Sequence, residues 1–185
     1  MIPLVVVSLV GVTLLVLAAS LYNRLIFLKN QCDKAWFNID VLLKQRHDEI
    51  PKLVAVCEGS KKFEQATLTQ VIAARNQAVA VGGSPAARAQ AEGQLSAAVG
   101  KLFAVAEAYP DLKSTALFAQ LSARVSQLEG ELADRREFYN DAVMTHNVAI
   151  ESVPANVIAG YAGMHGRELF KVDAADKADV EIKFA

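Results

Sequence analysis

The residues best suited to chemistry in this sequence lie together in the segment QRHDEIPKLV, residues 45–54. Arg46, His47 and Asp48 are adjacent there and offer a cation, an imidazole and a carboxylate at consecutive positions. Imidazole and carboxylate groups act as proton donors and acceptors in catalysis, and they also bind metal ions. Either use requires further side chains that converge from other elements of the fold. The segment is therefore a candidate site only if the rest of the chain supplies them.

The remaining sequence supplies few such partners. His146 and His165 fall on segments distant from His47, and His47 could meet His146 only across a helical bundle. The alternative is that both are ordinary hydrogen-bonded histidines of that bundle. The sequence contains no HExxH, no paired Glu-x-x-His, no GxSxG and no phosphate-binding glycine loop. We therefore predict a non-enzymatic protein with no catalytic residue, cofactor or metal, and keep a hydrolase as a remote alternative.

Arg46 and Arg135 carry a different signal, because each falls on the next step of an apolar helical pattern. Buried charges must be paired, so we expect both arginines to meet carboxylates on facing helices. Tyr139 and His146 would donate or accept hydrogen bonds in the same polar layer. The alternative is that both arginines reach solvent with only their stems packed. The acidic or amide residues near them in sequence are Asp40, Asp48, Glu129 and Asn140.

The elements that position these residues begin with an uncharged apolar run, LVVVSLVGVTLLVLAASL, at residues 4–21. A helix of this length covers about 27 Å, close to the ~30 Å of a bilayer core. A cleaved signal peptide is a weaker interpretation, because the preceding MIP carries no basic side chain. A buried core helix is the other alternative. We predict a single transmembrane helix over residues 4–22 that contacts membrane lipid.

The charges that flank this run predict its orientation. Arg24, Lys29 and Lys34 follow the run, and only the α-amine precedes it. Basic residues favour the cytoplasmic side of a membrane. We therefore predict a single-pass protein of the bacterial inner membrane, with its N-terminus outside and its bundle in the cytoplasm.

The apolar pattern continues after the run without a helix breaker as far as Pro51. Proline lacks an N–H and clashes with the carbonyl four residues earlier, here that of His47. The sequence therefore predicts a helix bend at Pro51, or a restart in which Asp48 caps the new helix. The apolar positions alternate in steps of three and four, a heptad pattern, at Leu25, Leu28, Cys32, Ala35, Ile39 and Leu42.

The rest of the chain reads as further helices separated by turns. GGSP (82–85) and YPDLK (109–113) are breaks by composition, and Pro154 ends the last long helical pattern. The predicted fold class is all-α, with an N-terminal single transmembrane helix that runs into a long antiparallel bundle of about four helices. The predicted segments are a short N-terminus (1–3), the transmembrane helix (4–22), the helical bundle (23–154), a short amphipathic segment (155–170) and a C-terminal tail (171–185).

The tail permits two interpretations. Val180, Ile182 and Phe184 alternate with charged residues, which is typical of a strand or an extended docking segment. A disordered tail is equally compatible with its composition.

Cysteine spacing and net charge exclude several classes of partner. Cys32 and Cys57 lie about 37 Å apart if they share one helix, far beyond the reach of a disulfide. Neither belongs to a CxxC pair, so we expect both to be small buried side chains. The net charge is −1, which offers no field that would attract nucleic acid.

The segment from residue 21 to residue 54, LYNRLIFLKNQCDKAWFNIDVLLKQRHDEIPKLV, resembles the signature of the LemA family. YPDLK (109–113) and RREFYNDAV (135–143) are similar to later family motifs. The resemblance covers essentially the whole chain and implies one N-terminal span, a helical bundle and an external N-terminus. Phe63 stands where the family often has histidine before Glu64, which weakens any metal site built on that histidine.

The predicted function follows from an anchor joined to a bundle without a catalytic constellation. We expect an adaptor or a self-assembling scaffold at the membrane, which binds a protein partner or its own copies as a homo-oligomer. One branch of the family resembles magnetosome membrane proteins, so the alternative is an oligomer that shapes or organises membrane.

Overall fold

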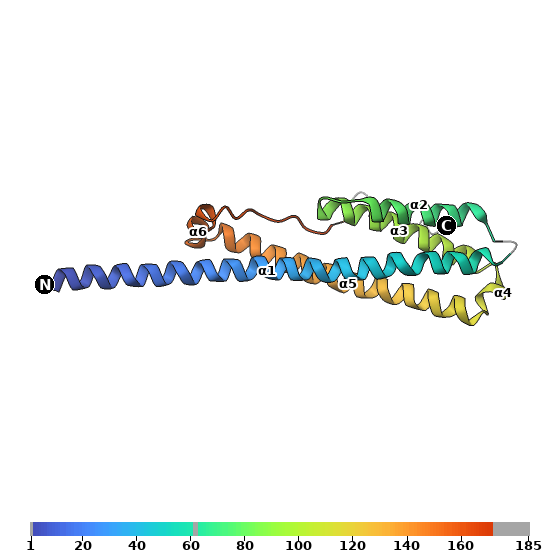
Figure 1. Cartoon of the computed structure of the whole chain (residues 1–185), viewed down its shortest axis with the longest axis horizontal. Coiled ribbons are helices and arrows are strands. Elements are labelled where there is room, and N and C mark those ends of the chain that lie inside the picture. The colour runs from blue at the N-terminus through green and yellow to red at the C-terminus, as the bar shows by residue number, and fades with distance from the viewer. Residues whose placement is uncertain (1, 61–62, 172–185) are drawn as a thin grey trace, which may run out of the picture. The chain divides into compact units, whose positions relative to one another are not determined.

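The computed structural model describes residues 2–60 and 63–171. This part of the chain contains six helices and no strand, which confirms the all-α prediction. Four helices are long, and α4 and α6 are short. In chain order they are α1 (Ile2–Glu58), α2 (Gln65–Ala80), α3 (Pro85–Ala106), α4 (Pro110–Lys113), α5 (Ala116–Glu151) and α6 (Ala155–Tyr161) (Figure 1).

α1 is a single helix of 57 residues, and Pro51 lies inside it. The predicted restart at Asp48 is therefore wrong, because the helix continues without interruption to Glu58 (Figure 1). Asp48 is exposed within the helix and caps nothing. A milder bend at Pro51 stays a prediction.

The N-terminal part of α1 is, among the described helices, the segment long and apolar enough to cross a membrane. Its large apolar side chains are exposed, from Ile2 at 81% to Leu17 at 49%. Such a surface is unfavourable in water and favourable in lipid. This part of α1 could therefore cross a membrane, and the bounds of the span, residues 4–22, stay a prediction.

Within the described residues the chain forms two compact units. The first unit combines residues 2–38 with 137–167, and the second combines 39–60, 63–136 and 168–171. α1 and α5 each contribute to both. The predicted alternation of Val180, Ile182 and Phe184 lies outside the described residues.

The second unit has a continuous apolar core. Its buried residues come from five helices, so each helix buries one face against the others, as in a helical bundle. The fully buried positions that represent the long helices in this core are Ile50 and Leu53 of α1, Val71 of α2, Leu95 and Leu102 of α3, and Val125 of α5.

A tight turn joins α2 to α3 within this unit. Gly83 has a φ of 97°, a conformation that favours glycine. The side chain of Ser84 accepts a hydrogen bond from the backbone N–H of Ala87 at 3.3 Å, and Pro85 occupies the first helical position. Capping serine and first-turn proline both stabilise a helix start, so α3 begins where GGSP ends.

In the first unit, Asn147 of α5 fixes the chain that follows α6. Its Nδ2 donates to the carbonyl of Arg167 at 2.9 Å, and its Oδ1 accepts from the N–H of Arg167 at 2.8 Å. The Arg167 guanidinium also donates to Asp33 of α1 at 2.7 Å. These bonds tie α1, α5 and the segment after α6 together.

Candidate functional site

Arg46 lies at the centre of a polar cluster in the second unit, with none of its side chain exposed. Its Nη1 donates to Glu92 of α3 at 3.1 Å, and its Nη2 donates to Ser96 of α3 at 2.9 Å and to Glu129 of α5 at 2.5 Å. The prediction that Arg46 pairs with carboxylates on facing helices is therefore correct. These four residues, Arg46, Glu92, Ser96 and Glu129, form the buried charge cluster.

Glu92 connects this cluster to His47. Its Oε1 lies 2.7 Å from His47 Nε2, while its Oε2 accepts from Arg46. Only 1% of the Glu92 side chain and 12% of the His47 side chain are exposed. A carboxylate removed from water in this way needs strong hydrogen bonds to both oxygens, and it has them.

The second arginine beside the cluster is Arg136 and not Arg135. Burial and repulsion from Arg46 lower the pKa of Arg136, while Glu92 and Glu129 oppose that effect. Arg135 is exposed, so its predicted place in the polar layer is wrong. Arg136 and the buried charge cluster together contain two guanidinium groups and two carboxylates, so their formal charges balance.

Arg136 is also held by an aromatic ring. Its Cζ lies 5.0 Å from the centre of the Phe170 ring, within the range of a cation–π contact. Its Nε and Nη2 are buried without a hydrogen-bond partner in the described part of the chain, and Arg46 Nε is in the same situation. Packing on Phe170 thus replaces part of the hydration that Arg136 loses.

A hydrogen bond between helices explains how Pro51 fits inside α1. Proline at this position leaves the carbonyl of His47 without its usual N–H donor. The Nε of Arg75, on α2, donates to that carbonyl at 3.2 Å. The backbone group that proline leaves unsatisfied is therefore paired by another helix, which ties α2 to α1.

A cavity of about 270 Å³ opens beside His47 in this unit. Asp48, Arg75 and Arg88 contribute to its wall, and Arg88 forms an ion pair with Asp40. Among the described residues, no group of three His, Cys, Asp or Glu side chains is placed to hold a metal ion. Two pairs of oppositely charged or ionisable side chains lie in its wall, Arg88 with Asp40 and His47 with Glu92.

Tyr139 and His146 belong to the first unit, where both side chains are buried. The ring of Tyr139 lies 5.2 Å from that of Trp36 and is tilted against it by 54°. His146 is 2% exposed, and its Nδ1 has no hydrogen-bond partner among the described residues. Arg46 belongs to the second unit, so a polar layer that these two residues share with Arg46 stays a prediction.

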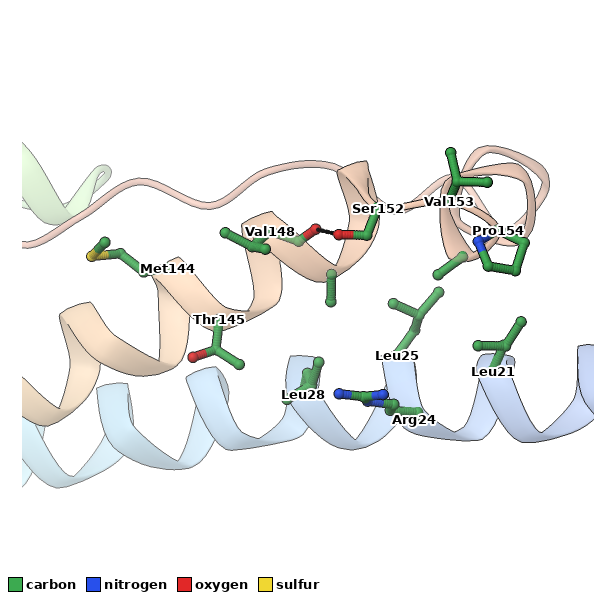
Figure 2. A pocket seen from close by; sticks show the side chains of 12 residues that line it. Leu21, Arg24, Leu25, Leu28, Met144, Thr145, Val148, Ser152, Val153 and Pro154 are labelled. Atoms are coloured by element: carbon green, nitrogen blue, oxygen red, sulfur yellow. Dashed lines mark hydrogen bonds between the residues drawn. The ribbon is translucent and has the colours of Figure 1, made fainter.

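The first unit contains an apolar cavity of about 650 Å³ between α1 and the end of α5. Leu21 and Leu25 point into it from α1, opposite Val148 of α5 (Figure 2). Arg24 is the charged residue in its lining. The cavity lies where α1 leaves its apolar run.

Comparison with known proteins shows which family the chain belongs to. The model of the LemA family matches residues 35–184, most of its length. The chain belongs to the LemA family. The match begins after the apolar run. All four residues of the buried charge cluster lie within the matched region of this LemA-family chain.

Several relatives of this LemA-family chain are known. Protein LemA of Metamycoplasma hominis is 24% identical over 159 residues, which are 86% of this chain and 73% of the relative. Magnetosome protein MamQ 2 of Paramagnetospirillum magneticum is 35% identical over 81 residues, which are 44% of this chain and 30% of the relative. Magnetosome protein MamQ of Magnetospirillum gryphiswaldense is 32% identical over 89 residues, which are 48% of this chain and 33% of the relative. The matched regions span about a third of these magnetosome relatives.

Sequence reasoning missed several residues that complete the site of the LemA-family chain. Glu92 lies in an alanine-rich stretch but follows the buried spacing of α3, three residues after Ala89 and seven before Val99. A charge in that position is the same signal that revealed Arg46. Arg75 carried no such signal, because its role depends on the carbonyl that Pro51 leaves open.

Proposed function

We propose that this LemA-family chain is a non-enzymatic, membrane-anchored helical protein that acts as a self-associating scaffold. The observation that carries the proposal is the exposure of three aromatic side chains of the first unit, beyond the apolar run. Phe37 is 65% exposed, Phe138 61% and Phe27 59%. Large apolar side chains at a surface favour protein–protein contact. Copies anchored in one membrane meet at a raised effective concentration, which favours a second copy as the partner.

The internal pairing of the buried charge cluster supports a structural role for its residues. Glu92 and Arg46 are each occupied by partners from other helices. A nucleophile or general base must instead reach a substrate. The cluster then stabilises the second unit and fixes the register of its helices.

Anchorage in the bacterial inner membrane, with the N-terminus outside, is part of the proposal. Arg24, Lys29 and Lys34 follow the apolar run, which favours a cytoplasmic location for the bundle. A cysteine introduced at exposed Ser126, in a variant without Cys32 and Cys57, tests it. Resistance to an impermeant maleimide in intact cells is expected, and labelling from outside would contradict this orientation.

Native mass spectrometry of the full chain, released from detergent micelles, tests self-association. The unchanged protein should give a dimer or a larger defined particle, and the double change Phe37→Ser, Phe138→Ser should shift it toward monomer. Val79→Ser is the matched control, because Val79 is 52% exposed on the second unit. A monomeric parent would contradict the scaffold and favour an adaptor for a different protein.

A second candidate is an oligomer that shapes or organises membrane. The similarity to MamQ proteins of two magnetosome-forming bacteria favours it. Reconstitution into vesicles of uniform size, followed by electron microscopy, distinguishes the candidates. A shaping oligomer changes vesicle diameter or makes tubules, whereas a scaffold without this activity leaves the vesicles unchanged.

A further inference from the structure

The apolar cavity of the first unit has the lining of a site for hydrocarbon. Leucines of α1 form one wall, and Met144, Val148 and Ala149 of α5 contribute to the other (Figure 2). Val153 and Pro154 close the end nearest α6. At about 650 Å³ the cavity is in the range of pockets that bind small organic ligands. A ligand that fills it must be largely apolar.

The position of the cavity along α1 indicates where such a ligand comes from. Leu21 ends the uncharged run and also lines the cavity. Arg24 lies about 4.5 Å further along the helix axis. The headgroup layer of a bilayer is about 6 Å deep on each side of the hydrocarbon core, so Arg24 is at the level of lipid phosphates.

Charge and neighbouring surface agree with this placement. Arg24 is the charged residue of the lining, and a guanidinium binds phosphate oxygens well. Val153, Val157 and Tyr161, in and before α6, are 83%, 58% and 93% exposed. Apolar and aromatic side chains of this kind are typical of a membrane interface. The mouth of the cavity is therefore suited to a lipid.

We propose that this cavity binds one anionic glycerophospholipid of the adjacent leaflet, with an acyl chain between α1 and α5 and its phosphate at Arg24. The inference rests on the proposed membrane anchorage and goes beyond it by assigning a specific lipid site. Val148 and Ala149 contact the chain, while Arg24 selects the anionic headgroup.

Native mass spectrometry of the full chain in mixed micelles tests the site. The protein is titrated with dioleoyl phosphatidylglycerol or, separately, dioleoyl phosphatidylcholine, and bound lipids per chain are counted. The unchanged protein should retain one phosphatidylglycerol and bind it more tightly than phosphatidylcholine. Arg24→Gln should weaken phosphatidylglycerol binding about fivefold, as expected for the loss of one interfacial basic residue. It should also abolish the preference for phosphatidylglycerol over phosphatidylcholine. Lys34→Gln removes an exposed charge of the same helix and should change nothing.

A second variant tests the hydrocarbon part of the site. Ala149→Trp fills space between α1 and α5. It should weaken the binding of both lipids about tenfold for every two methylene groups of the acyl chain that the indole ring excludes. Ala133→Trp, at an exposed position of α5, is its control. Circular dichroism confirms that each variant retains its helices. Arg24→Gln keeps the test decisive if Ala149→Trp does not fold.

Four outcomes would overturn the lipid site. The first is equal lipid retention by Ala149→Trp and by the unchanged protein, and the second is an equal effect of Arg24→Gln and Lys34→Gln on phosphatidylglycerol binding. The third is displacement of phosphatidylglycerol by inorganic phosphate alone. The fourth is that the unchanged protein retains no lipid. Failure of the scaffold proposal is seen separately, because the same spectra report oligomeric state independently of the lipids bound to each chain.

Discussion

At the scale of single residues, Arg46 shows how a charge is accommodated inside a helical unit. The guanidinium loses its hydration completely, and the loss of water around a buried ion costs several kcal/mol. Glu92 and Glu129 compensate with opposite charge, and Ser96 supplies an additional acceptor. Removing one member of such a group leaves another charge buried without its partner, so the residues depend on one another.

Arg46→Met should therefore lower the free energy of unfolding by about 3–5 kcal/mol, because Glu92 loses its arginine. Urea denaturation followed by circular dichroism measures the change. Arg135→Leu is the control and should alter stability by no more than about 0.5 kcal/mol, since Arg135 is exposed. Equal effects of the two changes would contradict the assignment of Arg46 as the buried arginine.

The thiol of Cys57 should be inert in the folded protein. Burial raises its pKa from 9.0 to about 11, and its side chain is 0% exposed. Because the thiolate is the reactive form, a shift of this size lowers the labelling rate about a hundredfold at neutral pH, before burial is counted. The Cys32→Ala variant isolates this thiol for labelling with iodoacetamide. Rapid labelling without denaturant would show that Cys57 is accessible.

The sequence pattern was sufficient to predict Arg46 as a buried, paired residue, but it did not predict Glu92 as one of its partners. Among the acidic residues near the two arginines in sequence, Glu129 pairs with Arg46, whereas Asp40 pairs with Arg88. Glu92 is distant in sequence from Arg46, and only the packing of α3 against α1 brings them together. Pairings between helices depend on which helices are neighbours, which periodicity along one helix does not reveal.

At the scale of elements, α5 shows why a heptad pattern misplaces residues over a long distance. After Leu132 the heptad pattern predicts Arg135, Tyr139 and His146 on the inner face. Tyr139 and His146 are buried, as is Val143, but Arg135 is exposed. A straight helix drifts by about 20° per heptad against a repeat of 3.5 residues. The half-buried residue that follows Leu132 is therefore Arg136, four positions later, and not Arg135, three positions later.

α1 continues through Pro51 because another helix supplies the missing donor. Arg75→Ala should lower the free energy of unfolding by about 1–2 kcal/mol, since the His47 carbonyl then lacks a partner. In a Pro51→Ala background the N–H of residue 51 can bond to that carbonyl, so the same change should cost less. Urea denaturation of the four proteins of this cycle gives the coupling energy. Additive effects would show that Arg75 does not compensate for the proline.

At the scale of the whole molecule, fold class followed from composition and spacing, because uncharged runs, helix breakers and apolar periodicity are local features. Four long helices and an apolar N-terminal segment were predictable for that reason. The division into two compact units was not, since α1 and α5 pass through both without a break in pattern. Arg46 and His146, for which the sequence predicts one polar layer, belong to different units.

The stability of the protein in acid should depend on His146. Burial, Arg167 and Lys29 lower its pKa below the ordinary value of 6.5, against the opposing effect of Asp33. The unfolded chain therefore binds a proton that the folded protein resists, so stability is complete above about pH 6.5 and decreases as the pH falls below it. His146→Asn should reduce this decrease.

Urea denaturation at about pH 7.5 and about pH 5.5 measures this dependence. His165→Asn is the control, because His165 is exposed, and it should retain the decrease seen in the unchanged protein. If His146→Asn loses as much stability in acid as the unchanged protein, other groups control the response.

In the proposed membrane anchorage, the unbroken helix α1 fixes both the direction of the Arg24 side chain and its distance from the bilayer. Each residue inserted between Leu21 and Arg24 rotates one side of the insertion against the other by about 100° and moves it by about 1.5 Å. Seven inserted residues nearly restore the rotation, but they carry Arg24 about 10 Å further from the bilayer. No short insertion preserves both the direction and the height of that guanidinium. The junction should therefore accept changes of side chain far more readily than changes of length.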